Sequence, residues 1–316
     1  MHSSPTILDR QEVRFPLELA PAVPKIRRLY RAATARQWNP ALDIDWASFD
    51  RSPYSDEQLL AARLRWSKTA WGEYGAISES PALQIRFCQE RREPDLSLFF
   101  ALRTQEESRH AETAFRFAEV LGGYFAEPQG SVAPVTEAAR DKDFKTTLYS
   151  HGVRRMAFDP AYSTETIIAS LVCVSEEVAF DMFKLFGEVT TDPIAKKVIA
   201  LIGRDEARHC AFGWDFLDHR VPRMSKAEID AMQDGIETFI RTIELNGYHH
   251  VWLKPDSAAV RAEVNAVRIT AGAGLGASTE ELEKPALVDS MARIRRRMAD
   301  WGVALPVFEH PRIGRC

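Results

Sequence analysis

Residues 106–110 read Glu-Glu-Ser-Arg-His, and residues 205–209 read Asp-Glu-Ala-Arg-His. Both segments have the order acid, Glu, any residue, Arg, His. On an α-helix, residues three apart lie on one face, so the Glu and the His of each segment can act together. With 45 acidic residues and 8 histidines, about one acid-x-x-His pair is expected by chance, but two copies of the longer pattern are not. The repeat therefore indicates a functional site.

Two Glu-x-x-His pairs, Glu107 with His110 and Glu206 with His209, are typical of half of a two-metal carboxylate site. Such a site in a helical bundle also takes one Glu from each of two other helices. Glu73 is the candidate on the first helix, 34 residues before Glu107. We therefore expect four helices to bring these side chains together.

Two adjacent acids, Glu176 and Glu177, compete for the remaining ligand position. The residues at helical steps from Glu176 are apolar, whereas the face of Glu177 carries Asp181 and Lys184. A carboxylate that points into an apolar bundle needs a partner, and a metal ion supplies one. We prefer Glu176, and Glu177 stays the alternative.

Four carboxylates and two imidazoles favour iron over zinc, which more often takes thiolates. Two ferrous ions would balance the four negative charges, and manganese would satisfy the same ligands. Metal-bound histidines usually donate their other ring N–H to a carboxylate. Asp205 is the candidate partner for His110, and Glu106 is the candidate for His209.

Helical periodicity and capping signals predict an all-α fold, a ferritin-like four-helix bundle with additional helices. The first helix should begin after Ser55, which has capping-box spacing to Gln58, and should end before Pro81, with a shorter helix at 82–92. The other three helices of the bundle are expected at 95–121, 164–186 and 192–219. The connection between the second and third is long, with a short helix expected near 137–149.

This pattern divides the chain into three parts. Residues 1–54 should form an N-terminal arm, residues 55–222 the four-helix bundle, and residues 223–316 further helices packed on the bundle.

Composition excludes several other classes of protein. The net charge of −4 gives no basic field for nucleic acid, and the four scattered cysteines form neither a disulfide framework nor a zinc motif. The N-terminus does not have the apolar core of a secretory signal, and no charge-free apolar stretch is long enough to cross a membrane. We therefore expect a cytoplasmic protein that binds neither nucleic acid nor membrane.

The two acid-Glu-x-Arg-His segments resemble those of the ferritin-like di-iron carboxylate superfamily. The resemblance covers residues 55–219. The two segments are similar to those of soluble acyl-carrier-protein desaturases and bacterial multicomponent monooxygenases, and the layout is similar to that of arylamine N-oxygenases. In those families the positions that match Glu73, Glu107, His110, Glu176, Glu206 and His209 ligate the metals. The N-oxygenases carry one more histidine a turn before Glu206, where this chain has Ile202.

The resemblance implies a non-haem di-iron oxidoreductase that activates O2. It would hydroxylate, N-oxygenate or desaturate a small or carrier-protein-tethered substrate, in a pocket near Phe100, Thr104, Phe180 and Phe183. No flavin or nicotinamide motif is evident, so the electrons should come from a separate reductase or ferredoxin, and a homodimer is expected. The alternatives are a ferroxidase or peroxide-scavenging iron protein, and a metal-free helical interaction protein.

Overall fold

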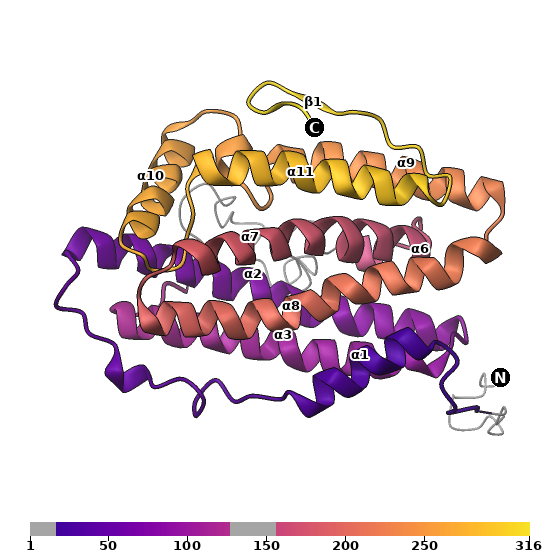
Figure 1. Ribbon diagram of the computed structural model, residues 1–316, viewed down its shortest axis with the longest axis horizontal. Coiled ribbons are helices and arrows are strands. Elements are labelled where there is room, and N and C mark those ends of the chain that lie inside the picture. Colours follow the sequence, from indigo (N-terminus) through magenta and orange to yellow (C-terminus); the bar gives the residue numbers. More distant parts are fainter. Residues whose placement is uncertain (1–16, 127–155) are drawn as a thin grey trace, which may run out of the picture.

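Four long helical segments lie side by side in the protein (Figure 1). The computed structural model describes residues 17–126 and 156–316. The segments are α2 (Asp56–Gln89), α3 (Pro94–Leu121), the run of α6 (Thr164–Ile167), η4 (Ile168–Ser175) and α7 (Glu176–Val189), and α8 (Pro193–Arg220). This arrangement confirms the all-α, ferritin-like bundle predicted from the sequence.

Side-chain caps fix where the helices of the bundle begin. The Ser55 hydroxyl accepts a hydrogen bond from the Gln58 amide N–H, and the Gln58 side chain accepts one from the Ser55 N–H, which completes the expected capping box. At the start of α8, Asp192 accepts a hydrogen bond from the Ala195 N–H, with Pro193 at the first helical position. Both predicted starts are confirmed.

The predicted end of the first helix at Pro81 is wrong, because α2 continues through this residue to Gln89. A proline inside a helix removes one backbone hydrogen bond. Here the apolar face continues beyond it, and both Leu83 and Phe87 are completely buried in the core. Packing on both sides of the proline thus outweighs the lost hydrogen bond.

The third helical segment is interrupted by the π-helical stretch η4, which the sequence pattern did not reveal. This stretch packs tightly against α8 at Gly213. A Cβ atom at Gly213 would lie 2.9 Å from Cys173 Sγ and 3.0 Å from the Val172 carbonyl oxygen. π-Helical turns in α-helices are rare and occur frequently at functional sites, and η4 ends immediately before Glu176.

The remaining helices cover the bundle. On the N-terminal side, α1 (Pro24–Ala35) packs on α3 and α8, and η2 (Trp46–Ser48) contacts α3. On the C-terminal side, α9 (Lys226–Thr242) packs on α6 and η4, α10 (Ala258–Gly272) on α2, and α11 (Glu280–Ala299) on α7. Short elements complete the chain: η5 (Val221–Arg223), η6 (Glu244–Asn246), η7 (Val251–Leu253) and the antiparallel pair β1 (Glu309–His310) and β2 (Gly314–Arg315).

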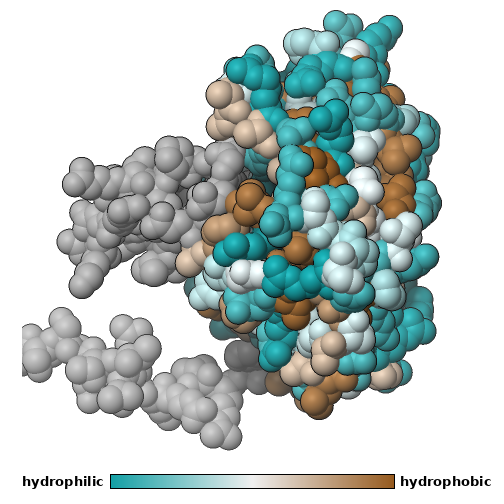
Figure 2. Space-filling model, turned by 90° about the vertical axis from the view of Figure 1, so that its left-hand side faces the viewer, coloured by the Kyte–Doolittle hydropathy of each residue, from teal (hydrophilic) through white to brown (hydrophobic). Residues whose placement is uncertain are grey.

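The expected helix near residues 137–149 lies outside the described residues. The division into an arm, a bundle and a C-terminal part stays a prediction. No helix in the described ranges is long and apolar enough to cross a membrane. On the face shown in Figure 2, hydrophobic side chains are interspersed with hydrophilic ones.

The loop between α10 and α11 is fixed to α2 by two hydrogen bonds. Trp66 Nε1 donates to the Leu275 carbonyl oxygen at 2.9 Å, and Arg65 Nε donates to the Gly276 carbonyl oxygen at 2.8 Å. Gly276 has a φ of +95°, and a Cβ atom there would lie only 2.6 Å from the Trp66 ring. A glycine is therefore required at this contact for both its conformation and its size.

We expect Gly276→Ala to lower the free energy of unfolding by about 2–4 kcal/mol, since it combines backbone strain with overpacking. Urea denaturation followed by circular dichroism measures the change. Gly272→Ala is the matched control, because a Cβ atom at Gly272 meets no atom within 4 Å. Equal stability of the two variants would contradict this account of the loop.

Candidate metal centre

The six predicted ligands converge in the interior of the bundle. They come from α2 (Glu73), α3 (Glu107 and His110), α7 (Glu176) and α8 (Glu206 and His209). Their side-chain oxygen and nitrogen atoms form two groups, each with its atoms within 4.8 Å of one another, and Glu107 belongs to both. The first group contains Glu73, Glu107, His110 and Glu206, and the second contains Glu107, Glu176 and His209.

Both histidines turn their Nδ1 atom toward the glutamates. Nδ1 of His110 lies 3.0 Å from Glu206 Oε1 and 3.7 Å from Glu107 Oε2. Nδ1 of His209 lies 3.2 Å from Glu206 Oε2 and 3.4 Å from Glu107 Oε1. Glu107 and Glu206 therefore lie between the two imidazoles, and Glu107 could contribute to both ligand groups.

The outer nitrogen of each imidazole faces an acid on the opposite helix. His110 Nε2 lies 3.5 Å from Asp205 Oδ2, and His209 Nε2 donates a hydrogen bond to Glu106 Oε2 at 2.9 Å. These are the two pairings expected from the sequence. An imidazole that is held in this way keeps its Nδ1 atom directed at the cluster of glutamates.

Arg109 and Arg208 neutralise the two outer acids. Arg208 binds both Glu106 and Asp205, and Arg109 lies 3.2 Å from Asp205 and 3.5 Å from Glu106. All four side chains are buried. Arg204 Nε also lies 3.6 Å from Asp205, so the two acids beside the histidines are paired with arginines on both helices.

Trp38 extends this network into the predicted arm, and sequence analysis did not identify it. Its indole Nε1 donates to Asp205 Oδ2 at 2.8 Å, and its ring stacks at 6.5 Å from the His110 ring. No pattern around residue 38 points to the site, because its contact depends on how α1 and the following loop pack against α3 and α8.

Arg103 and Glu79 are two further charged residues that the sequence analysis missed. Arg103 is completely buried, lies 3.0 Å from Glu107 and 3.0 Å from Glu79, and also binds Glu176. It is one helical turn before Glu107, and this spacing was the only signal in the sequence. Arg103 places a fixed positive charge beside two of the predicted ligands.

The structure separates the two competing acids of the third helical segment. Glu176 is buried in the second ligand group. Glu177 instead accepts hydrogen bonds from Trp214 Nε1 at 2.9 Å and Cys210 Sγ at 3.1 Å, and it faces Arg293. Its carboxylate is therefore directed away from the other candidate ligands.

Protons balance part of the negative charge in the metal-free cluster. Burial lowers the pKa of His209, but the charges of Glu206 and Glu107 outweigh it and raise the pKa to about 10. The pKa of His110 is likewise raised well above its usual value, against burial, by Asp205, Glu107 and Glu206. Burial and the Glu206 charge raise the pKa of Glu176. At neutral pH both imidazoles are thus protonated.

The donor set fits a pair of metal ions. Neither ring nitrogen of His110 has a hydrogen bond of good geometry within the described residues, although the side chain is completely buried. A buried nitrogen without a partner is costly, and a metal ion at Nδ1 would satisfy it. Carboxylate and imidazole donors in this number suit iron and manganese.

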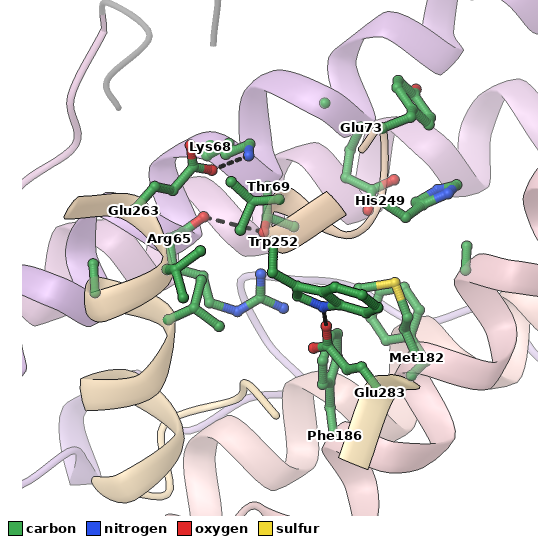
Figure 3. A pocket seen from close by; sticks show the side chains of 18 of the residues that line it. Arg65, Lys68, Thr69, Glu73, Met182, Phe186, His249, Trp252, Glu263 and Glu283 are labelled. Carbon is green, nitrogen blue, oxygen red and sulfur yellow. Dashed lines mark hydrogen bonds and ion pairs between the residues drawn. The ribbon is translucent and has the colours of Figure 1, made fainter. Parts of the chain in front are cut away.

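A cavity of about 490 Å³ adjoins the cluster. Its inner end is lined by Glu73, Glu107, Glu176 and Glu206, and it extends between α2, α7, α10 and the loop that contains η7. In Figure 3, Glu73 and His249 lie on one side of the labelled set, with Arg65 and Glu283 farther along the cavity. A ligand in this cavity could therefore reach the candidate metal positions.

One of the four predicted pocket residues lines this cavity. Phe183 lines the cavity. Phe100 is instead completely buried in an aromatic cluster with Phe87 and Phe212, and neither Thr104 nor Phe180 is among the residues that line the cavity. The cavity lies on the α2 and α10 side of the bundle, which the sequence analysis did not consider.

The fold and the buried carboxylate cluster place the chain among ferritin-like helical bundles. Three similar solved structures are R2-like ligand-binding oxidases. A variant with an anaerobically reconstituted Mn/Fe cofactor has a TM-score of 0.62 at 15% identity, over 88% of this chain and 94% of that one. A second, with an aerobically reconstituted metal cofactor after photoconversion, has a TM-score of 0.59 at 14% identity over the same shares of the two chains.

The third, a variant with an aerobically reconstituted Mn/Fe cofactor, has a TM-score of 0.60 at 14% identity, over 89% of this chain and 98% of that one. No family model and no curated protein matches the sequence. At these low identities the likeness establishes the shared fold, over nearly the whole length of both chains.

Metal binding should release protons, because a divalent ion binds only the neutral imidazole. We expect the two imidazole protons to leave at pH 7, together with any proton held by Glu176, whose pKa is raised, and the affinity to rise with pH through the neutral range toward the His209 pKa of about 10. Calorimetry in buffers of different ionisation enthalpy counts these protons. An affinity that falls as the pH rises would contradict ligation through the two imidazoles.

Proposed function

We propose that the protein binds two metal ions through Glu73, Glu107, His110, Glu176, Glu206 and His209, and uses them with O2 to oxidise an organic molecule. The observation that carries this proposal is that the two ligand groups adjoin the cavity. All four glutamates of these groups also line the cavity. A substrate in the cavity would lie beside the residues that would hold the metals. Asp205 and Glu106 would orient the two histidine ligands.

The charges of the interior support two divalent ions. The four glutamate ligands carry four negative charges, which two divalent ions balance, while Arg103 and Glu79 compensate each other. When bound, such ions supply redox chemistry toward O2. The similar structures carry a Mn/Fe cofactor, and the same donor types here suit iron in both positions or one iron and one manganese.

The chain's own residues would prepare the site for this chemistry. The Arg103 charge holds Glu107 and Glu176 in place, and against the effect of burial it keeps the pKa of Glu107 low. Phe183, Phe186 and Met182 line the cavity with apolar surface, which limits the access of water to a bound substrate. A separate reductase or ferredoxin would supply electrons, and the protein would act as a homodimer.

Hydroxylation, N-oxygenation and desaturation are the reaction types that this site supports, on a small or carrier-tethered substrate. The size of the cavity disfavours the alternative of a ferroxidase or peroxide scavenger, because iron oxidation needs no space for an organic ligand. A metal-free interaction protein would not require an apolar cavity that ends on four glutamates.

Metal content and oxygen reactivity test the proposed function. Protein from cells supplied with iron and manganese should contain about two metal ions per chain, and the reduced protein should consume O2 with a change in its visible absorption. Glu107→Ala removes the ligand shared by both groups and should abolish both signals. A wild-type protein with no metal, or with one zinc ion, would refute the proposal.

Substitution of the two adjacent glutamates tests the ligand set. We expect Glu176→Gln to reduce the metal content from about two ions to about one, since it removes a charged ligand from the second group only. Glu177→Gln is the matched control and should keep both ions, because Glu177 contacts Trp214 and Cys210 instead. Metal analysis after dialysis measures both. Loss of metal in Glu177→Gln alone would reverse the assignment.

A further inference from the structure

Most charged groups along the outer part of the cavity already have partners. Lys68 forms an ion pair with Glu263. Glu283 accepts hydrogen bonds from Trp252 Nε1 and from the Ser278 hydroxyl, each at 2.7 Å. These side chains therefore have little capacity left to bind a charged ligand.

Arg65 differs from these neighbours. Its Nε donates to the Gly276 carbonyl oxygen, and its guanidinium lies over the Phe186 ring at 4.6 Å. Within residues 17–126 and 156–316, no carboxylate lies at ion-pair distance from Arg65, and no acceptor binds its two terminal nitrogens. Figure 3 shows the guanidinium pointing toward Trp252 and Glu283, inside the group of cavity residues.

The charge of Arg65 is thus fixed in place but not neutralised by contact. Glu283 and Glu263 act on it only through space, and the carboxylates of both are engaged elsewhere. Burial lowers the pKa of Arg65, which reflects the cost of a partly desolvated cation. An anion at the terminal nitrogens would offset this cost. The planar guanidinium group can donate two parallel hydrogen bonds to a carboxylate.

The position of Arg65 sets the distance between a bound anion and the glutamate cluster. Arg65 and Glu73 are eight residues apart on α2, a rise of about 12 Å. Phe186, which supports the guanidinium, is ten residues from Glu176 on α7, a rise of about 15 Å. Both spacings place the guanidinium at the end of the cavity that is distant from the glutamate cluster.

We propose that the cavity binds an organic anion whose carboxylate is held by Arg65 and whose apolar body extends toward Glu73 and Glu176. Met182, Phe183 and Phe186 line the path between these ends. The acidic group would thus be held beside Arg65, whose backbone lies about 12 Å along α2 from that of Glu73. That this anion is also the molecule oxidised rests on the proposed function.

Paired acids and amides test the anion site without any turnover. Binding of ω-phenylalkanoates, from 4-phenylbutyrate to 8-phenyloctanoate, and of their primary amides is measured by calorimetry. The best-fitting acid should bind about tenfold more tightly than its amide. In Arg65→Gln the acid should lose about 10- to 100-fold in affinity, and the amide less than about threefold.

Lys68→Gln is the matched control, because it removes the same charge from the same helix at a lysine that is already paired with Glu263. It should change the affinity for the acid by less than about threefold. The ratio between acid and amide within each variant is insensitive to a general loss of stability. Equal binding of acid and amide by the wild type, no binding of any probe, or an unchanged ratio in Arg65→Gln would overturn the proposal.

The orientation of the ligand is tested with bound Mn²⁺. In an ω-(4-fluorophenyl)alkanoate, the fluorine resonance should broaden more than that of the methylene beside the carboxylate, since the paramagnetic ions lie at the other end from Arg65. The reverse order would overturn the orientation. Failure to bind either Mn²⁺ or Fe²⁺ would refute the proposed function instead, and the comparison of acids with amides would still decide the anion site.

Discussion

The placement of four glutamates inside an apolar bundle, three of them buried and Glu73 half-buried, is the constraint on which the rest of this structure depends. A carboxylate without a partner in such an interior costs several kcal/mol. The fold supplies compensation from three directions: two protonated imidazoles, the Arg103 guanidinium, and the positions that metal ions can fill. The glutamates and the side chains that compensate their charges come from different helices. These charges are therefore compensated only when the four helices pack side by side.

The clustering of the six candidate ligands could be predicted because these residues lie on helices. The spacing of three between Glu107 and His110 is a property of any α-helix, and the apolar neighbours of Glu176 distinguish it from Glu177 within one element. The same local logic located the caps at Ser55 and Asp192. These predictions needed only the pattern of a single helix, although the same local reasoning wrongly ended the first helix at Pro81.

The groups that were missed owe their positions to contacts between elements. Arg103 reads in the sequence like any charged residue on a solvated helix face, and only the approach of α2 and α7 buries it against Glu79 and Glu176. Trp38 reaches Asp205 across 167 positions of the chain. The aromatic residues expected near a substrate behaved in the same way: Phe100 packs in the core, and the cavity formed where α10 covers α2.

Gly72 affects how large a molecule the cavity can hold. It lines the cavity on α2 between Arg65 and Glu73, and a Cβ atom at this position would meet no atom within 4 Å. The distance along α2 between those two residues is fixed, because the rise per residue of an α-helix is constant. A larger side chain at position 72 would therefore shorten the usable space without disturbing the packing of the bundle. Descendants of this protein could change the size of the molecules that they accept through this one codon.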